Sequence, residues 1–264
     1  MRILVVANVN CDRVWLLDEP LHAGGRHAVR KTHERTGGAG YHAAAAIARL
    51  GGRATLSASL ARDERGARLM ADVAARGIET TGVVHAHPAT TPLDILLEPD
   101  GQRTILYRPT AAPPAIWPAP GANAPYDGLY VNSTPAMPAH AAALVAAGSP
   151  ILAQLPVATQ EGTHPAPILV SSADERPDRG LAEVWSRAVC VSGGHAQRLV
   201  LTDGPRPIRV LGGAGVLATI PITPIVGRAT TGAGGFFAGA LLLHLARGLA
   251  LAGACAAPAP ATRT

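Results

Sequence analysis

Aromatic side chains are scarce in this chain of 264 residues, since Phe, Trp and Tyr together make up only 3% of it. Proteins that bind single-stranded nucleic acid stack the bases on aromatic rings, and this chain has few such rings. Lysine is rarer still: Lys31 is the single lysine among 23 basic residues, and no basic run is long enough for a nucleic-acid or membrane patch. We therefore expect neither a nucleic acid nor a membrane as a partner.

Cysteine is also rare, and its positions exclude two classes of small domain. The three cysteines are odd in number and far apart, at Cys11, Cys190 and Cys255. They have neither the CxxC spacing of a metal site nor the regular spacing of a disulfide framework. This usage indicates a reducing compartment, and we expect a cytoplasmic protein.

No apolar run is typical of a secretion signal or a membrane span. The run at 3–7 is too short for the core of a signal peptide. The long stretch Phe236–Ala257 carries His244 and Arg247, which would be costly in lipid, so we expect a buried helix there. The GxSxG, HExxH and Walker A motifs of common hydrolases and P-loop enzymes are absent as well.

The residues that are abundant indicate a folded α/β protein that binds anions. Apolar residues make up 48% of the chain and charged residues 16%, which excludes an extended disordered chain. The net charge of +5 favours small anionic ligands such as nucleotide phosphates.

Short apolar runs alternate with alanine-rich helical segments. Repetition of strand, helix and strand is typical of a mostly parallel sheet covered by helices on both faces. The expected helices are Tyr41–Leu50 and Gly66–Arg76. The expected strands are Ile3–Ala7, Ala54–Ser59, Gly128–Asn132, Ile151–Leu155, Ile168–Ser171 and Leu199–Thr202.

Two places break this alternation and predict a small second sheet. Val14–Leu17 with His27–His33, and Pro92–Glu98 with Arg103–Tyr107, have the pattern of strand pairs. We assign them to a lid sheet formed by segments at about 13–35 and 88–108 of a single domain, 1–257. Exposed edges of such a sheet favour a homodimer through the lid. We expect the tail, 258–264, to be disordered.

The strongest motif is a glycine-rich turn that precedes the apolar helix, in the segment Thr230–Leu241. Successive small residues let the backbone approach a ligand, and a helix start offers unpaired N–H groups and a positive dipole end. The segment therefore predicts an anion hole suited to a phosphate. A glycine turn that only caps the helix is the structural alternative.

A second glycine cluster, Gly37–Gly40, opens the helix expected at Tyr41–Leu50. As a dinucleotide-binding fingerprint it lacks a short buried strand before it, because 27–35 is polar. A turn that lets a small hydroxylated ligand lie against the backbone fits these residues better.

Taken in order, these segments resemble the PfkB/ribokinase family of ATP-dependent sugar and nucleoside kinases over nearly the whole chain. The resemblance implies a ribokinase-like three-layer αβα sandwich with a mostly parallel central sheet and a small β lid. The segments that carry it are Asn10-Cys11-Asp12, Gly37–Gly40, Ala61–Gly66, the hairpin sequence PDGQRT at 99–104, Leu201–Gly204 and Thr231–Gly234.

The same resemblance implies transfer of a phosphoryl group from ATP to a sugar hydroxyl, with Mg²⁺ bridging the phosphates. The residues implied to bind the sugar are Asn10, Asp12, Gly37, Gly38 and His42. Those implied to form the anion hole are Gly232, Ala233 and Gly234. Those implied to bind the nucleotide are Thr202, Gly204 and Thr231.

The chain departs from the family pattern at the positions of catalysis. The aspartate that serves as the base in the family is replaced by Gly235, and the acid that opens the same signature by Ala229. His42 stands where the family has an asparagine near the sugar. The family's Asn-x-x-Glu element is missing, and Asp174 and Glu175 are the candidates to replace it at Mg²⁺.

Three functions follow from these observations. The first is an ATP-dependent carbohydrate kinase whose activity is weak or lost, because removing a positioned base lowers a rate by on the order of 10²–10⁴. The second is a catalytically inactive relative that binds sugar or nucleotide. The third, a dinucleotide-dependent oxidoreductase, rests only on the glycine fingerprint.

Overall fold

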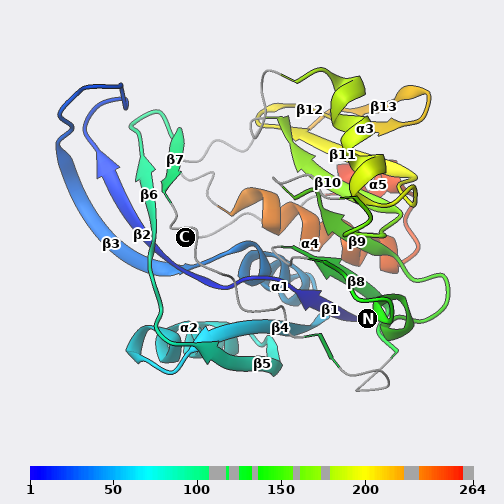
Figure 1. The fold of residues 1–264 in the computed structure, drawn as a ribbon, viewed down its shortest axis with the longest axis horizontal. Helices are drawn as coiled ribbons and strands as arrows, with labels where there is room; N and C mark the ends of the chain where they lie inside the picture. The colour runs from blue at the N-terminus through cyan, green and yellow to red at the C-terminus, as the bar shows by residue number, and fades with distance from the viewer. Residues whose placement is uncertain are drawn as a thin grey trace.

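The apolar runs of the sequence lie side by side in one nine-stranded sheet, in the computed structural model of this chain (Figure 1). The structure describes residues 1–106, 117–118, 125–132, 136–156, 161–173, 179–222 and 232–257. The strands, in spatial order, are β13 (Gly215–Ile220), β12 (Arg206–Gly212), β11 (Arg198–Asp203), β10 (Ile168–Ser172), β9 (Ile151–Gln154), β8 (Gly128–Val131), β1 (Arg2–Val6), β4 (Arg53–Ala61) and β5 (Glu79–His87). Every pair from β11 to β5 is parallel, and β12 and β13 add an antiparallel hairpin at one edge.

Alternating side chains of the strands supply two apolar cores, one on each face of this sheet. In β1, Ile3 and Val5 belong to one core, while Leu4 and Val6 belong to another. The first core also contains residues of α1 (Ala39–Arg49), α2 (Glu64–Ala75), α4 (Ala233–Ala246) and α5 (Leu251–Ala256). The opposite face is covered by α3 (Leu181–Val191) and a short 3₁₀ helix, Ala141–Leu144. The three-layer αβα sandwich is thus confirmed.

A four-stranded sheet projects to one side of the large one (Figure 1). Its spatial order is β3 (Val29–Gly37), β2 (Asn10–Leu17), β6 (Leu93–Leu97) and β7 (Arg103–Leu106). Two antiparallel hairpins, β2–β3 and β6–β7, are joined by the parallel pair β2–β6. The expected strand pairs are confirmed, except that Tyr107 lies outside the described residues. β2 begins four residues earlier than expected, so Asn10 and Asp12 belong to this small sheet.

The two faces of the β2–β3 hairpin have different surroundings. Cross-strand pairing sets Arg13 beside Glu34 on one face and Asp12 beside Arg35 on the other. Glu34 forms ion pairs with two arginines of α2, Arg65 at 2.9 Å and Arg68 at 3.0 Å. One face of the small sheet is therefore held against α2, while the face that carries Asp12 is not.

The prediction of one helix over Phe236–Ala257 is wrong, because α4 ends at Ala246 and α5 begins at Leu251. Gly248 lies between them with a φ of 88°, a left-handed conformation that ends helices. Its N–H donates a hydrogen bond to the Leu245 carbonyl at 2.9 Å. Among the described residues, no helix combines the length and the apolar character needed to cross a membrane.

Three strands were not expected from the sequence: β5, β12 and β13. β5 and β13 are the edges of the large sheet, and most of their residues are partly or fully exposed. An exposed edge strand has no need of a regular apolar pattern, so its sequence resembles that of a loop.

Helices α1 and α4 pack unusually closely because small residues line their contact. A Cβ atom at Gly239 would lie 2.2 Å from the carbonyl oxygen of Ala43. One turn earlier, a Cβ atom at Gly235 would lie 3.0 Å from the carbonyl oxygen of Ala39. Gly235 and Gly239 are four residues apart, as are Ala39 and Ala43, so each pair lies on one helix face. The two backbones therefore touch over this length.

This contact predicts a large difference between two glycine-to-alanine substitutions. Gly239→Ala is expected to lower the free energy of unfolding by about 1–3 kcal/mol, because the added methyl group overlaps the backbone of α1. Gly253→Ala, in α5, meets nothing within 4 Å and is the matched control. It is expected to leave the free energy unchanged or to raise it by up to about 1 kcal/mol. Urea denaturation measures both, and equal stabilities would contradict the close packing.

Candidate functional site

The candidate site lies where the end of β1, the start of β2 and the start of α1 come together. The chain passes from β1 to β2 through 7–9, and α1 begins directly against this connection. The N–H of Gly40 donates a hydrogen bond to the Asn8 carbonyl at 3.0 Å. Gly38 has a φ of 92°, and a Cβ atom there would lie 2.7 Å from the same carbonyl oxygen. Glycine is needed at this turn for both its conformation and its size.

The carboxylate of Asp12 lies against Gly37, the first glycine of the Gly37–Gly40 cluster. A Cβ atom at Gly37 would lie 2.0 Å from the Asp12 Oδ2 atom, so only glycine leaves room for the carboxylate. The side chain is buried, and its Oδ1 atom has no hydrogen-bond partner. Burial raises the pKa of Asp12 from 3.8 to about 6, and the opposing charge of Arg35 offsets only part of this effect. The group is thus a carboxyl that titrates close to neutral pH.

His42, in the first turns of α1, packs against the start of α4. A Cβ atom at Gly232 would lie 2.4 Å from the His42 Nε2 atom, and one at Gly235 would lie 3.1 Å from the His42 Cβ atom. Burial lowers the pKa of His42 from 6.5 to about 4, and the charges of Arg35 and Arg76 add to this effect. The imidazole is therefore neutral near pH 7, and its buried Nε2 atom has no hydrogen-bond partner.

The turn before α4, where the sequence predicts an anion hole, is a tight helix start. Gly232 is the N-cap residue with a φ of 91°, and the helix proper starts at Ala233. The first N–H groups of a helix lack intrahelical partners and lie at its positive end, so the amides of Ala233 and Gly234 are free to bind an anion. Gly37 contacts Asp12, and His42 contacts Gly232. The short segment 37–42 therefore links the Asp12 carboxylate to the start of α4.

Residues implied to bind the nucleotide also lie at the carboxyl ends of the parallel strands, but further along the large sheet. Thr202 is the penultimate residue of β11, where its hydroxyl donates a hydrogen bond to the Ser171 carbonyl at 3.2 Å. Gly204, with a φ of 54°, follows in the β11–β12 turn. β11 is four strands from β1, which corresponds to about 19 Å at the usual strand spacing. A bound ligand that reaches both places has to be extended.

Four of the residues considered in the sequence need separate comment. Asn10 begins β2, and its Oδ1 atom accepts a hydrogen bond from Asn8 Nδ2 at 3.0 Å. Thr231, Asp174 and Glu175 lie outside the described residues. In the part of the chain that is described, no three or more His, Cys, Asp and Glu side chains gather as a metal site would require.

Sequence reasoning missed Arg35, which stands directly across from Asp12 in the β2–β3 pair. Its Nε and Nη2 atoms are buried without a hydrogen-bond partner. The register of the hairpin is what brings the two residues together, and neither the motif nor the composition contains this information.

Asp63 was assigned to a motif, and the structure explains why an acidic residue is useful there. Its carboxylate accepts a hydrogen bond from the N–H of Gly66 at 2.7 Å and so caps α2. It also accepts bonds from the N–H and the hydroxyl of Thr90, at 2.6 and 2.7 Å. Thr90 lies just before β6, so Asp63 ties the connection to the small sheet onto α2.

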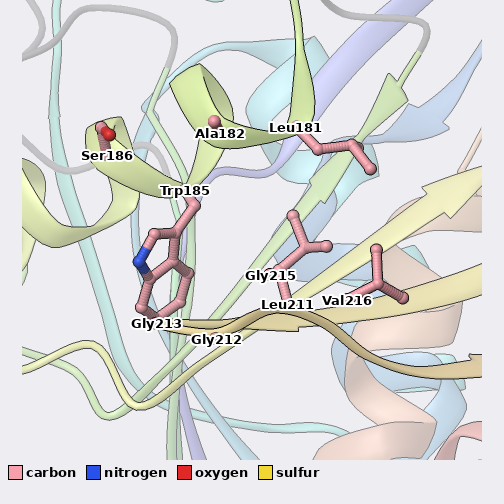
Figure 2. A pocket seen from close by; sticks show the side chains of 9 residues that line it. All are labelled: Leu181, Ala182, Trp185, Ser186, Leu211, Gly212, Gly213, Gly215 and Val216. Carbon is pink, nitrogen blue, oxygen red and sulfur yellow. The ribbon is translucent and has the colours of Figure 1, made fainter.

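An apolar cavity of about 370 Å³ lies away from all of these residues, between α3 and the β12–β13 turn (Figure 2). Trp185 and Leu181 of α3 face Leu211 and Val216 across it. Leu211 pairs with Leu199 at the start of β11, so the cavity is at the opposite end of that strand from Thr202. It has no titratable lining residue and is not part of the candidate site.

The raised pKa of Asp12 predicts a pH-dependent effect of removing its charge. Between about pH 4 and pH 6 the folded chain holds a proton that the unfolded chain has lost, so wild-type stability falls as the pH rises through this range. Asp12→Asn is therefore expected to be more stable than wild type by about 1–3 kcal/mol near pH 7 and to lose this advantage near pH 4. Urea denaturation as a function of pH measures the difference. A constant difference at all pH values would contradict the burial of a titrating carboxyl.

Comparisons with known proteins agree with this architecture. The model of the pfkB family of carbohydrate kinases matches residues 2–146. No curated protein matches the chain. Among solved structures, a protein assigned as a ribokinase from Agrobacterium tumefaciens has a TM-score of 0.75 at 22% identity, covering 97% of this chain and 87% of its own. The ribokinase of Cryptococcus neoformans, in complex with ADP, has a TM-score of 0.71 at 21% identity, covering 96% of this chain and 90% of its own.

A third similar structure comes from a nucleoside kinase. The nucleoside kinase of Burkholderia thailandensis, in complex with inosine, has a TM-score of 0.69 at 17% identity, covering 97% of this chain and 86% of its own. At these identities the structural matches show a common fold, and the sequence model shows the family. The chain belongs to the pfkB family of carbohydrate kinases and has the ribokinase-like fold.

Proposed function

We propose that this chain is an ATP-dependent kinase that transfers a phosphoryl group to a hydroxyl of a sugar or a sugar-like molecule. The observation that carries this proposal is the contact chain from Asp12 through Gly37 and His42 to Gly232. It sets a buried carboxylate with an unpartnered oxygen at one end of a short segment and a helix start with free amides at the other. Such an arrangement suits a hydroxylated acceptor next to a transferring phosphate.

The acceptor is held at the base of the small sheet. The Asp12 carboxylate and the Asn10 amide bind its hydroxyl groups, and the glycines at 37 and 38 let its ring lie against the backbone. His42 is neutral and borders both the acceptor side and the phosphate side of the segment. ADP is bound by one relative and inosine by another, which supports a nucleotide and a hydroxylated acceptor as the two substrates here.

The phosphates lie at the start of α4. The amides of Gly232, Ala233 and Gly234 stabilise charge on the transferring group, and Thr202, Gly204 and Thr231 bind the rest of the nucleotide. The acceptor oxygen forms a bond to the terminal phosphorus as the bond to the leaving ADP oxygen breaks. The hydroxyl proton leaves with solvent or through Asp12, since Gly235 offers no acceptor.

Mg²⁺ is compatible with this site without a dedicated protein cage. The ion is usually held by one or two carboxylates, by substrate phosphates and by water, and when bound it neutralises charge on the phosphates. Asp174 and Glu175 are the proposed carboxylates.

A second candidate function, non-catalytic binding of a sugar or a nucleotide, is favoured by the packing at Gly235. A Cβ atom there would lie 3.0 Å from the Ala39 carbonyl oxygen and 3.1 Å from the His42 Cβ atom. The close contact of α1 and α4 leaves little room for the missing aspartate.

The dinucleotide alternative lacks its structural context, because the Gly37–Gly40 cluster follows β3 of the small sheet. A homodimer through that sheet and a cytoplasmic location stay predictions.

Turnover with ATP, Mg²⁺ and a panel of sugars tests the first function against the second. Wild type is expected to release ADP slowly in the presence of the right sugar, and Asp12→Ala to reduce this release to background. Gly235→Asp is expected to raise kcat by on the order of 10²–10⁴, because it restores a proton acceptor. Gly235→Asp is also expected to lower the free energy of unfolding, because its Cβ atom would lie 3.0 Å from the Ala39 carbonyl oxygen and 3.1 Å from the His42 Cβ atom.

Gly253→Ala is the control for this series and is expected to match wild type, because its side chain meets nothing within 4 Å. If wild type is inactive and Gly235→Asp is active, the binding function replaces the catalytic one. If neither protein has activity and neither binds ADP or any sugar of the panel, both functions are excluded.

A further inference from the structure

Arginines near the small sheet differ in whether they have an anionic partner. On the face towards α2, Arg65 and Arg68 both bind Glu34, and Arg13 binds Asp94 at 2.6 Å. On the opposite face stands Arg35. Among the described residues it forms no ion pair, and its Nε and Nη2 atoms are buried without a hydrogen-bond partner.

Guanidinium nitrogen atoms that are buried without a partner are costly, because their N–H groups have lost water and gained nothing in return. Neighbouring groups feel its charge: it lowers the pKa values of His33 and His42, in each case after the larger effect of burial. Several other side chains around it also have buried polar atoms without partners. These are Asn8, Asp12, His33 and His42.

Asp12 faces Arg35 but does not neutralise it. Where Arg65 hydrogen-bonds to Glu34, the pKa of that carboxyl falls to about 2. The pKa of Asp12 is instead raised to about 6 by burial, despite the charge of Arg35. The two side chains are cross-strand neighbours with a gap between their charged groups, and each is left with unpartnered atoms.

We propose that Arg35 binds an anionic group of the acceptor substrate, so that this kinase acts on a sugar acid or a sugar phosphate. The inference rests on the proposed function and names its substrate class. A molecule that carries hydroxyls and an oxyanion satisfies both orphaned groups at once, the hydroxyls at Asp12 and the oxyanion at Arg35.

The chemistry of the two side chains sets the shape of this acceptor. Directly opposed residues of an antiparallel pair have Cβ atoms about 5 Å apart, so the anion and the bound hydroxyls belong to one small molecule. Guanidinium N–H groups form paired hydrogen bonds with the oxygens of a carboxylate or a phosphate. Arg35 lies on the small sheet beside Asp12, not at the α4 turn, which assigns it to the acceptor and not to the nucleotide.

Titration calorimetry without ATP tests this, with neutral and anionic members of matched pairs as probes. The probes are ribose with ribose 5-phosphate, and glucose with gluconate and glucose 6-phosphate. Wild type is expected to bind at least one anionic member about tenfold or more tightly than its neutral partner. Arg35→Met is expected to reduce this preference to within about twofold, and Arg35→Lys to retain part of it. The gluconate and phosphate arms distinguish a carboxylate from a phosphate.

Arg30→Met is the matched control, because Arg30 is on the same strand and its side chain is 63% exposed. It is expected to behave like wild type. A wild type that binds no anionic member more tightly, or an Arg35→Met variant that keeps the preference, overturns the inference. So does a loss confined to the binding of a non-hydrolysable ATP analogue, which would assign Arg35 to the nucleotide. The proposed function is tested separately. If the turnover assay shows no phosphoryl transfer, that function fails even where the anion preference is found.

Discussion

The contact between α1 and α4 sets the relative positions of the two glycine-rich turns on which the candidate site depends. Gly239 lies against Ala43 with no space for a side chain, and one turn earlier Gly235 lies against Ala39. Because both helices begin within two turns of this contact, their starts are held at a defined separation. The two turns of the candidate site are therefore positioned by backbone packing, which is stiff, and not by long side chains.

The same packing has a consequence for the chemistry. His42 packs against Gly232 and Gly235, and position 235 is where the family pattern has its catalytic aspartate. A side chain at position 235 would meet the Ala39 carbonyl oxygen at 3.0 Å and the His42 Cβ atom at 3.1 Å. Gly235 therefore fits the contact between the two helices, although it cannot accept a proton.

Buried polar groups without partners lower stability at the candidate site. Burial raises the pKa of Asp12, and two buried nitrogen atoms of Arg35 have no hydrogen-bond partner, so both groups have lost solvation on folding. On the other face of the same hairpin, Glu34 is fully matched by its arginines. One face of the small sheet is thus held to α2 by ion pairs, while the other carries unpartnered groups, which is why we propose the acceptor there.

The amino-acid sequence by itself determined the architecture. Apolar runs and alanine-rich helices predicted the parallel sheet, and the polar strand pairs predicted the small one, because burial imposes a periodic pattern that is local in the chain. This reasoning did not predict the helix break or the edge strands. Gly248 ends a helix without any change in composition, and β13 is too exposed to need a periodic apolar pattern.

For the site, the motifs identified Asp12, His42 and the turn at Gly232 as separate candidates, because each belongs to a short segment with a recognisable residue order. Only the tertiary structure decided that His42 packs on Gly232, that Gly235 has almost no room for a side chain, and that Arg35 stands across from Asp12. These facts arise from strand register and helix packing, which join residues far apart in the chain through contacts that no single segment encodes.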